Sequence, residues 1–111
     1  MAKATIIIKG RVQGVGYRYF VRGKAKKFSI KGLVRNLKNG SVEVFAEGDE
    51  EQIKAFITEI KYSSAESNAI VEELSAYSKG SPGYKGPWRL YNNNFIIDRS
   101  SRREDEYIHE D

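Results

Sequence analysis

The pattern of apolar and polar positions along the chain predicts strands that alternate with helices. Residues 4–9 (ATIIIK) form a β-branched apolar run that is too short for a helix, as expected of a strand. In the segment 18–28, Val21, Ala25 and Phe28 are spaced by four and three residues, which places them on one face of a helix. The chain therefore begins with a predicted strand, a loop and a helix.

A β-hairpin is predicted next. The pair Asn39-Gly40 separates the runs 30–37 and 41–47, and Asn-Gly is a strong hairpin signal because both residues tolerate positive φ. In the second run apolar and polar positions alternate, so one face is expected to be apolar and the other mixed.

A second helix is predicted after the hairpin. Asp49 is placed to cap its N-terminus, with Gln52 three residues later, in the spacing of a capping box. The apolar positions of the segment lie on one helical stripe, and they are Ile53, Phe56, Ile57 and Ile60.

The remainder of the chain has a weaker pattern. Residues 68–78 fit no period cleanly, although a strand is favoured. Residues 79–94 hold three glycines and both prolines and are predicted to be a loop, in which Trp88 and Tyr91 are expected to pack over the core edge. Residues 95–98 (FIID) predict a final short strand.

This order of elements predicts the fold class. The order β-α-β-β-α-β is that of an α+β, ferredoxin-like sandwich, with an antiparallel four-stranded sheet and two helices on one face. We expect this domain to span residues 1–98, followed by a flexible charged tail at residues 99–111. The fold alone says little about function, since many unrelated activities share it.

Composition narrows the chemistry. The 111 residues include no cysteine and a single histidine, His109, so neither a thiolate nucleophile nor a metal site is expected. No stretch has the length and apolarity of a membrane span, and the first ten residues lack a signal-peptide pattern; we expect a cytoplasmic protein.

The charge is unevenly distributed. The net charge is +4, and residues 99–111 hold three Arg and five Asp or Glu, a net −2, which leaves +6 on residues 1–98. A basic body favours an anionic partner, either a small phosphorylated ligand or a nucleic acid.

The loop between the first strand and helix has the features of an anion site. Gly14 and Gly16 precede Arg18; glycines allow backbone N–H groups to converge on an anion, and arginine binds phosphate through two parallel hydrogen bonds. Two nucleotide-binding motifs are excluded. A P-loop needs Gly-Lys-Ser/Thr where the chain has Gly16-Tyr17, and a dinucleotide fingerprint needs Gly or Ala where the chain has Tyr19.

Two stretches resemble the signatures of the acylphosphatase family. The first is GRVQGVGYR at residues 10–18. The second is GLVRN at residues 32–36, followed at the family's spacing by Gly40, Val42 and Gly48. Together they make the resemblance highly specific.

The resemblance extends over roughly residues 4–98 and implies hydrolysis of acyl phosphates to a carboxylate and inorganic phosphate, without metal or cofactor. It implies that Arg18 binds the phosphate and that Asn36 positions the attacking water. Leu33 stands where the family has an aromatic residue, which concerns strand packing more than chemistry. The implied phosphate cradle consists of the backbone N–H groups of Gln13, Gly14, Val15, Gly16, Tyr17 and Arg18.

The residue types suit this reaction. An acyl phosphate has a weakly basic leaving group, so positioning and charge stabilisation are expected to supply most of the rate. The expected partners are a small acyl phosphate and the inorganic phosphate released from it. Neither a membrane nor a nucleic acid is expected as a partner, and the protein is expected to be a monomer.

Two alternatives remain open at this point. A basic ferredoxin-like sheet with exposed aromatic residues can bind single-stranded RNA, and Tyr17, Tyr19 and Phe45 are candidates for such contacts. Alternatively, the chain is a repurposed domain, similar to those in larger carbamoyl-handling proteins.

Overall fold

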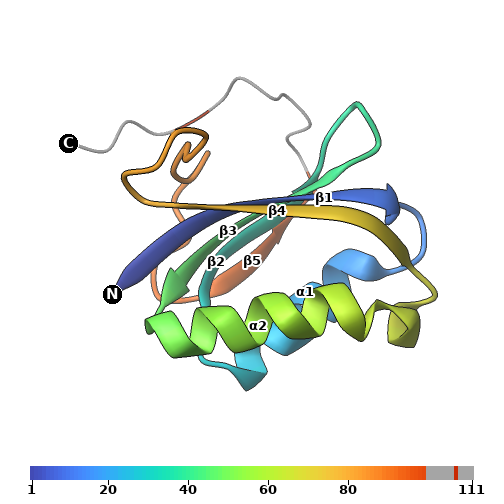
Figure 1. Cartoon of the computed structure of the whole chain (residues 1–111), viewed down its shortest axis with the longest axis horizontal. Coiled ribbons are helices and arrows are strands. Elements are labelled where there is room, and N and C mark those ends of the chain that lie inside the picture. Colours follow the sequence, from blue (N-terminus) through green and yellow to red (C-terminus); the bar gives the residue numbers. More distant parts are fainter. Residues whose placement is uncertain (100–106, 108–111) are drawn as a thin grey trace.

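A five-stranded mixed sheet with both helices on one face makes up the protein, as a computed structural model of residues 1–99 and Tyr107 describes it (Figure 1). The strands lie in the order β4-β1-β3-β2-β5. The bounds of the elements are β1 Ala2–Arg11, α1 Tyr17–Lys27, β2 Lys31–Asn36, β3 Val42–Gly48, α2 Glu50–Tyr62, a 3-10 turn Ser64–Ser67, β4 Ile70–Ser78 and β5 Phe95–Asp98.

The predicted α+β class with two helices on one face is confirmed, but the prediction of four antiparallel strands is wrong. The first four strands pair antiparallel in the order expected of a ferredoxin-like sheet. Both uncertain segments at the end of the chain are strands. Residues 70–78 form β4 beside β1, and residues 95–98 add β5, which runs parallel to β2.

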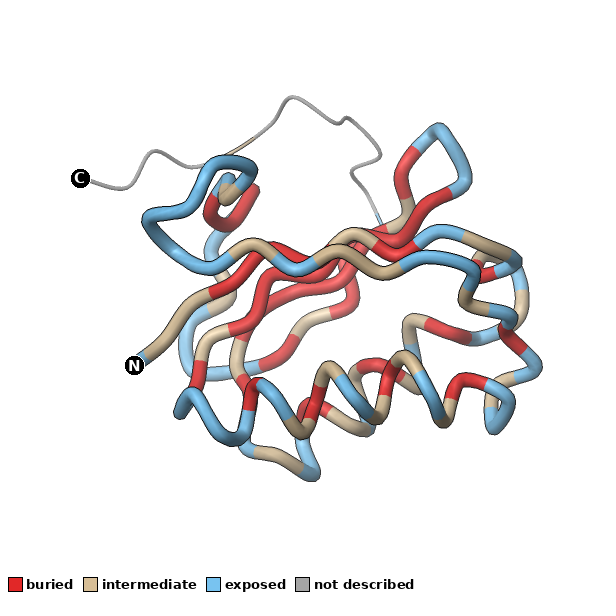
Figure 2. The backbone as a smooth tube through the Cα atoms, in the orientation of Figure 1, coloured by how far each residue is buried: buried red, intermediate tan, exposed pale blue. Residues whose placement is uncertain are grey.

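The main core lies between the sheet and the helices, where Figure 2 shows the buried positions of the helices turned toward the strands. Helix α1 buries Tyr17, Val21 and Ala25, and α2 buries Ile53, Phe56 and Ile60. The predicted stripes are confirmed except at their margins. Phe28 is the C-cap residue of α1 rather than part of it, and Phe28 and Ile57 are only partly buried. Asp49 is the N-cap residue of α2, as expected, but no side-chain hydrogen bond completes a capping box.

A second, smaller core covers the other face of the sheet. Leu33 and Phe45 point to this face and pack with Trp88 and Tyr91 of the loop at residues 79–94. The expected packing role of these two loop residues is confirmed. Their indole and phenol rings cover the position where Leu33 replaces the aromatic residue of the family signature.

The β2–β3 hairpin is confirmed, with a three-residue loop. Leu37 N–H donates to the Ser41 carbonyl, and Gly40 N–H donates to the Leu37 carbonyl. Gly40 has a φ of 94°, whereas Asn39 keeps a negative φ and its side chain accepts from Ser41 N–H. The Asn-Gly pair therefore lies in a type I turn that is followed by a glycine in the left-handed conformation.

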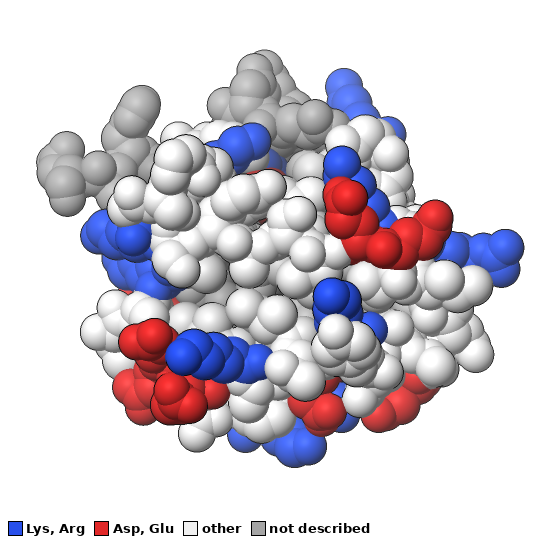
Figure 3. All heavy atoms as spheres, viewed as in Figure 1, with Lys and Arg blue, Asp and Glu red and all other residues white. Residues whose placement is uncertain are grey.

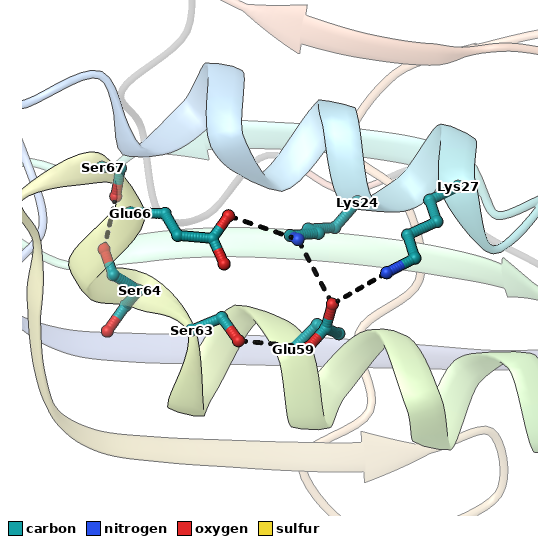
Figure 4. Close-up of polar contacts among 7 residues, drawn as sticks. All are labelled: Lys24, Lys27, Glu59, Ser63, Ser64, Glu66 and Ser67. Atoms are coloured by element: carbon teal, nitrogen blue, oxygen red, sulfur yellow. Dashed lines mark hydrogen bonds and ion pairs between the residues drawn. The ribbon is translucent and has the colours of Figure 1, made fainter.

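Polar contacts join the two helices on their solvent side (Figure 4). Lys24 and Lys27 of α1 each lie 3.2 Å from Glu59 Oε1 of α2, and Lys24 also lies 3.4 Å from Glu66. Ser63 donates to the other oxygen of Glu59 at 3.1 Å. These contacts hold α1 against α2 and lie away from the loop that precedes α1.

Of the predicted tail at residues 99–111, the structure describes Arg99 and Tyr107, and both contact the folded body. The remaining tail residues lie outside the described residues. The flexibility of the tail and the domain boundary at residue 98 therefore stay predictions.

Candidate active site

The loop between β1 and α1 holds two exposed glycines with open space beside them. Gly14 and Gly16 both have a φ of 78°, a left-handed conformation that favours glycine. A Cβ added to either glycine would meet no atom within 4 Å. Each glycine therefore allows a ligand to approach the backbone closely.

The N-terminus of α1 follows directly after these two glycines. Gly16 is its N-cap residue, no side chain caps the helix, and the first turn holds no acidic residue. The first backbone N–H groups of a helix have no partner within the helix, and the dipole adds partial positive charge there. Arg18 is the second residue of α1 and is half-buried. The local charge thus favours an anion.

Gln13 anchors this loop to the β2–β3 hairpin. Its side-chain Nε2 donates to the carbonyl oxygens of Leu37 and Ser41, both at 2.8 Å. The side chain is therefore engaged in the protein, and a contribution of Gln13 to an anion site has to come from its backbone. No local sequence pattern indicated this anchoring.

Asn36 lies beside the anchored loop. It ends β2, and the next residue is Leu37, which accepts the hydrogen bond from Gln13. Strands β1 and β2 both run antiparallel to β3, so their carboxyl ends meet at the same edge of the sheet. In Figure 1 the β1–α1 loop and the hairpin lie at the same end of the molecule, opposite the N-terminus.

The side-chain oxygen of Asn36 is an unsatisfied acceptor. Oδ1 is closed to solvent and has no hydrogen-bond partner among residues 1–99 and Tyr107. A buried acceptor without a partner destabilises the fold by about 1–3 kcal/mol, and such atoms in native proteins commonly have a functional explanation. This oxygen is therefore an acceptor of the site that the described residues leave without a partner.

Tyr17 and Val15 serve the core with their side chains. Tyr17 is 1% exposed, and its hydroxyl donates to the Ile60 carbonyl at 2.6 Å. Burial raises the pKa of the Tyr17 hydroxyl well above its ordinary value, which leaves the group neutral. Val15 is half-buried and packs against the same core. Only the backbone N–H groups of these two residues are left for an anion.

A group of aromatic and cationic side chains adjoins this site, and the sequence analysis missed its cationic members. The guanidinium of Arg22 lies 5.4 Å from the centre of the Tyr19 ring, and that of Arg99 lies 5.2 Å from the same ring. The helical spacing of Tyr19 and Arg22 could have indicated their contact. Arg99 is distant in sequence, and no local pattern could have placed it here.

One hollow of the described residues lies away from the hairpin. A hollow of about 340 Å³ lies at the other end of β1 and is lined by residues that include Lys3, Ile53 and Lys79, but by none of the predicted site residues. Residues 1–99 and Tyr107 contain no group of His, Cys, Asp or Glu that could hold a metal ion.

Comparisons with known proteins place this geometry in context. The acylphosphatase family model matches residues 4–86. An acylphosphatase of Treponema denticola is 43% identical over 79 residues, which are 71% of this chain and 82% of the relative. An acylphosphatase of Bacillus licheniformis is 41% identical over 90 residues, which cover 76% of this chain and all of the relative.

Solved structures agree with this likeness. The crystal structure of acylphosphatase from Bacillus subtilis has a TM-score of 0.70 and 33% identity, covering 88% of this chain and 99% of that one. Full-length HypF, in a phosphate- and nucleotide-bound form, has a TM-score of 0.67 and 31% identity. The match covers 89% of this chain but only 12% of HypF, so the likeness concerns one segment of that larger protein.

Proposed function

The chain belongs to the acylphosphatase family and is a hydrolase that acts on acyl phosphates. We propose that the β1–α1 loop and Arg18 hold the phosphoryl group of the substrate, while Asn36 orients the attacking water. The observation that carries this proposal is the buried, unpartnered Oδ1 of Asn36 beside the anchored glycine loop.

Phosphate binding falls to the backbone and to Arg18. The N–H groups of residues 13–18 would bind the phosphoryl oxygens, and the open space beside Gly14 and Gly16 lets such an oxygen approach the chain. The guanidinium of Arg18 supplies two parallel donors to the phosphoryl oxygens. These groups stabilise the charge that spreads over the phosphoryl oxygens in the transition state.

Asn36 would act on the water. Its Oδ1 accepts a hydrogen bond from the water and so orients a lone pair toward phosphorus, in line with the breaking bond to the carboxylate. Attack forms a new phosphorus–oxygen bond and releases the carboxylate, and the proton of the water passes to a phosphoryl oxygen or to the carboxylate. Positioning of this kind removes much of the entropic barrier.

We also propose that the enzyme works as a cytoplasmic monomer without metal or cofactor, on a domain of residues 1–98. In support, no helix within residues 1–99 and Tyr107 is long and apolar enough to cross a membrane. The face shown in Figure 3 mixes basic and acidic side chains, so this face is not a continuous basic surface of the kind that binds RNA.

The test is hydrolysis of benzoyl phosphate in the presence of EDTA, with wild type, Arg18→Ala and Arg11→Ala compared. Arg11 is exposed at the end of β1 and serves as the matched control. We expect turnover and inorganic-phosphate binding to be lost in Arg18→Ala and retained in Arg11→Ala. Equal activity of wild type and Arg18→Ala would overturn the assigned role of Arg18.

A further inference from the structure

We propose that Arg22 and Arg99, held against the ring of Tyr19, form a second anion subsite that binds the acyl group of the substrate. The preferred substrates would then be acyl phosphates whose acyl group carries an additional carboxylate. This inference rests on the phosphate site proposed above, because it requires the acyl group to leave that site toward Tyr19.

The first support is the position of the group on α1. Tyr19 follows Arg18 directly, and Arg22 lies four residues after Arg18. Residues spaced by three and four are neighbours on a helix surface. Arg22 therefore lies one turn further along the same side of α1 as the proposed phosphate-binding Arg18.

The second support comes from the sheet. In the parallel pair of β2 and β5, Arg35 is opposite Asp98, so the next residues along the two strands, Asn36 and Arg99, lie at the same edge of the sheet. The guanidinium of Arg99 also packs on Tyr19. Arg99 thus reaches from the strand end beside Asn36 to the first turn of α1.

The third support is the absence of compensating charge. Within residues 1–99 and Tyr107, neither Arg22 nor Arg99 forms an ion pair with a carboxylate. The nearest acid in sequence, Asp98, is 1% exposed and accepts hydrogen bonds from Trp88 and Arg89. Two guanidinium groups near one ring repel each other, and an anion that contacts both relieves that repulsion.

The ring of Tyr19 has a specific part in this arrangement. It is 47% exposed, so part of the residue is open to solvent beside the two arginines. Stacking on a ring restrains a guanidinium while leaving the N–H donors at its edge free to bind a carboxylate. The ring therefore orients the two cations at low entropic cost.

The experiment uses substrate pairs that differ in a single charge: 3- and 4-carboxybenzoyl phosphate, each compared with its methyl counterpart. Wild type, Arg22→Ala, Arg99→Ala and Lys26→Ala are assayed for kcat/KM. Lys26 is an exposed cation one turn after Arg22 on the same helix and is the matched control. Because every variant is assayed on the same substrate pairs, differences in the intrinsic lability of the substrates cancel when the variants are compared.

We expect Arg22→Ala and Arg99→Ala each to lower kcat/KM by about fivefold on a carboxy substrate, since exposed charge pairs contribute up to about 1 kcal/mol. The methyl substrates should change by less than about twofold, and Lys26→Ala should behave as wild type. Arg22→Lys should recover part of the preference. In wild type the preference should fall with added salt, because salt screens exposed charges.

Two results would overturn the subsite, and they differ in what they say of the phosphate site. If both arginine variants lower kcat/KM equally on the carboxy and methyl substrates, or leave it unchanged on both, the second anion subsite is wrong while the phosphate site stands. If wild type hydrolyses none of the four compounds and Arg18→Ala does not alter phosphate binding, the proposed function fails and the subsite with it.

Discussion

The guanidinium of Arg35 and the carboxylate of Glu43 form an ion pair that is fully closed to solvent, with Nη2 and Nε of Arg35 lying 2.7 Å and 2.8 Å from the same oxygen, Oε1. The two residues are directly opposite each other on β2 and β3. The other oxygen of Glu43 accepts a hydrogen bond from Tyr107 at 2.8 Å, and the guanidinium lies 4.2 Å from the centre of the Trp88 ring.

The ion pair predicts a strong asymmetry between single and double variants. Glu43→Gln or Arg35→Met alone leaves a buried charge without its partner and should lower the free energy of unfolding by about 3–5 kcal/mol. The double variant Arg35→Met/Glu43→Leu removes both charges and should lose much less. Urea unfolding monitored by circular dichroism measures all three; equal losses from the single and double variants would contradict this account.

Asn36→Ala should separate turnover from binding. Loss of the water-holding oxygen should lower kcat by about a hundredfold, while affinity for inorganic phosphate, measured by calorimetry, stays within about twofold because Asn36 does not contact the phosphate. In contrast, Asn36→Asp places a negative charge beside the site and should weaken phosphate binding as well. Loss of phosphate affinity in Asn36→Ala would show that Asn36 is structural.

Replacement of glycine by alanine should have opposite effects on the free energy of unfolding at Gly10 and at Gly23. Gly10 has a φ of 137° at a bulge between β1 and β4, and a Cβ there would lie 2.1 Å from the Ile70 carbonyl oxygen. Gly10→Ala should therefore lower the free energy of unfolding by at least about 2 kcal/mol.

Gly23 is the matched control, because it lies within α1 and a Cβ there would meet no atom within 4 Å. Gly23→Ala should raise the free energy of unfolding by about 0.5–1 kcal/mol, since alanine is the better helix former. Thermal unfolding followed by circular dichroism compares the two variants. A stabilised Gly10→Ala protein would show that the bulge can rearrange.

The contacts of Glu59 predict how stability depends on pH. Hydrogen bonds from Lys27, Lys24 and Ser63 hold the pKa of the Glu59 carboxyl below its ordinary value of 4.5. The stabilisation is therefore present above pH 4.5 and is lost as the pH falls below that value toward the pKa of the folded protein. Glu59→Gln should be less stable than wild type at neutral pH, and the difference should shrink in acid.

The control for this titration is Glu51→Gln. Glu51 is on the exposed side of α2, and its contact with Lys54 is 3.6 Å long with both side chains mostly in solvent. Such a pair contributes little, so this variant should follow the wild-type pH profile in urea unfolding. A pH-independent difference between wild type and Glu59→Gln would exclude titration of Glu59 as the cause.

The helices were predictable from a clear period, whereas the pattern of β4 at the sheet edge was weak. The stripes of α1 and α2 face a single core, so their burial follows from spacing. Strand β4 borders the sheet and is partly exposed on both faces, with Glu72 and Glu73 open to solvent. Its sequence therefore shows no clean alternation, and the count of strands came out one too low.

Some features of the candidate site follow from local sequence motifs, and others depend on contacts between distant segments. The glycine loop and Asn36 were predictable because they lie in continuous motifs that resemble known signatures. The anchoring of the loop by Gln13 and the contact of Arg99 with Tyr19 depend on segments that only the fold brings together. Arg35 and Glu43 would be expected in water from their charges, and their burial results from Trp88 and Tyr107 on that face.

The place of β1 in the sheet has a consequence for how the chain folds. The first strand to leave the ribosome lies between β3 and β4, and its pairing with β4 joins Ala4 to Ser78. The second neighbour of β1, strand β4, exists only after residues 70–78 of the 111 have been made. Such a distant pairing closes a large loop before it gains contacts. The chain should therefore fold slowly for its size and only after synthesis, and during that interval the apolar residues of β1 need protection from aggregation.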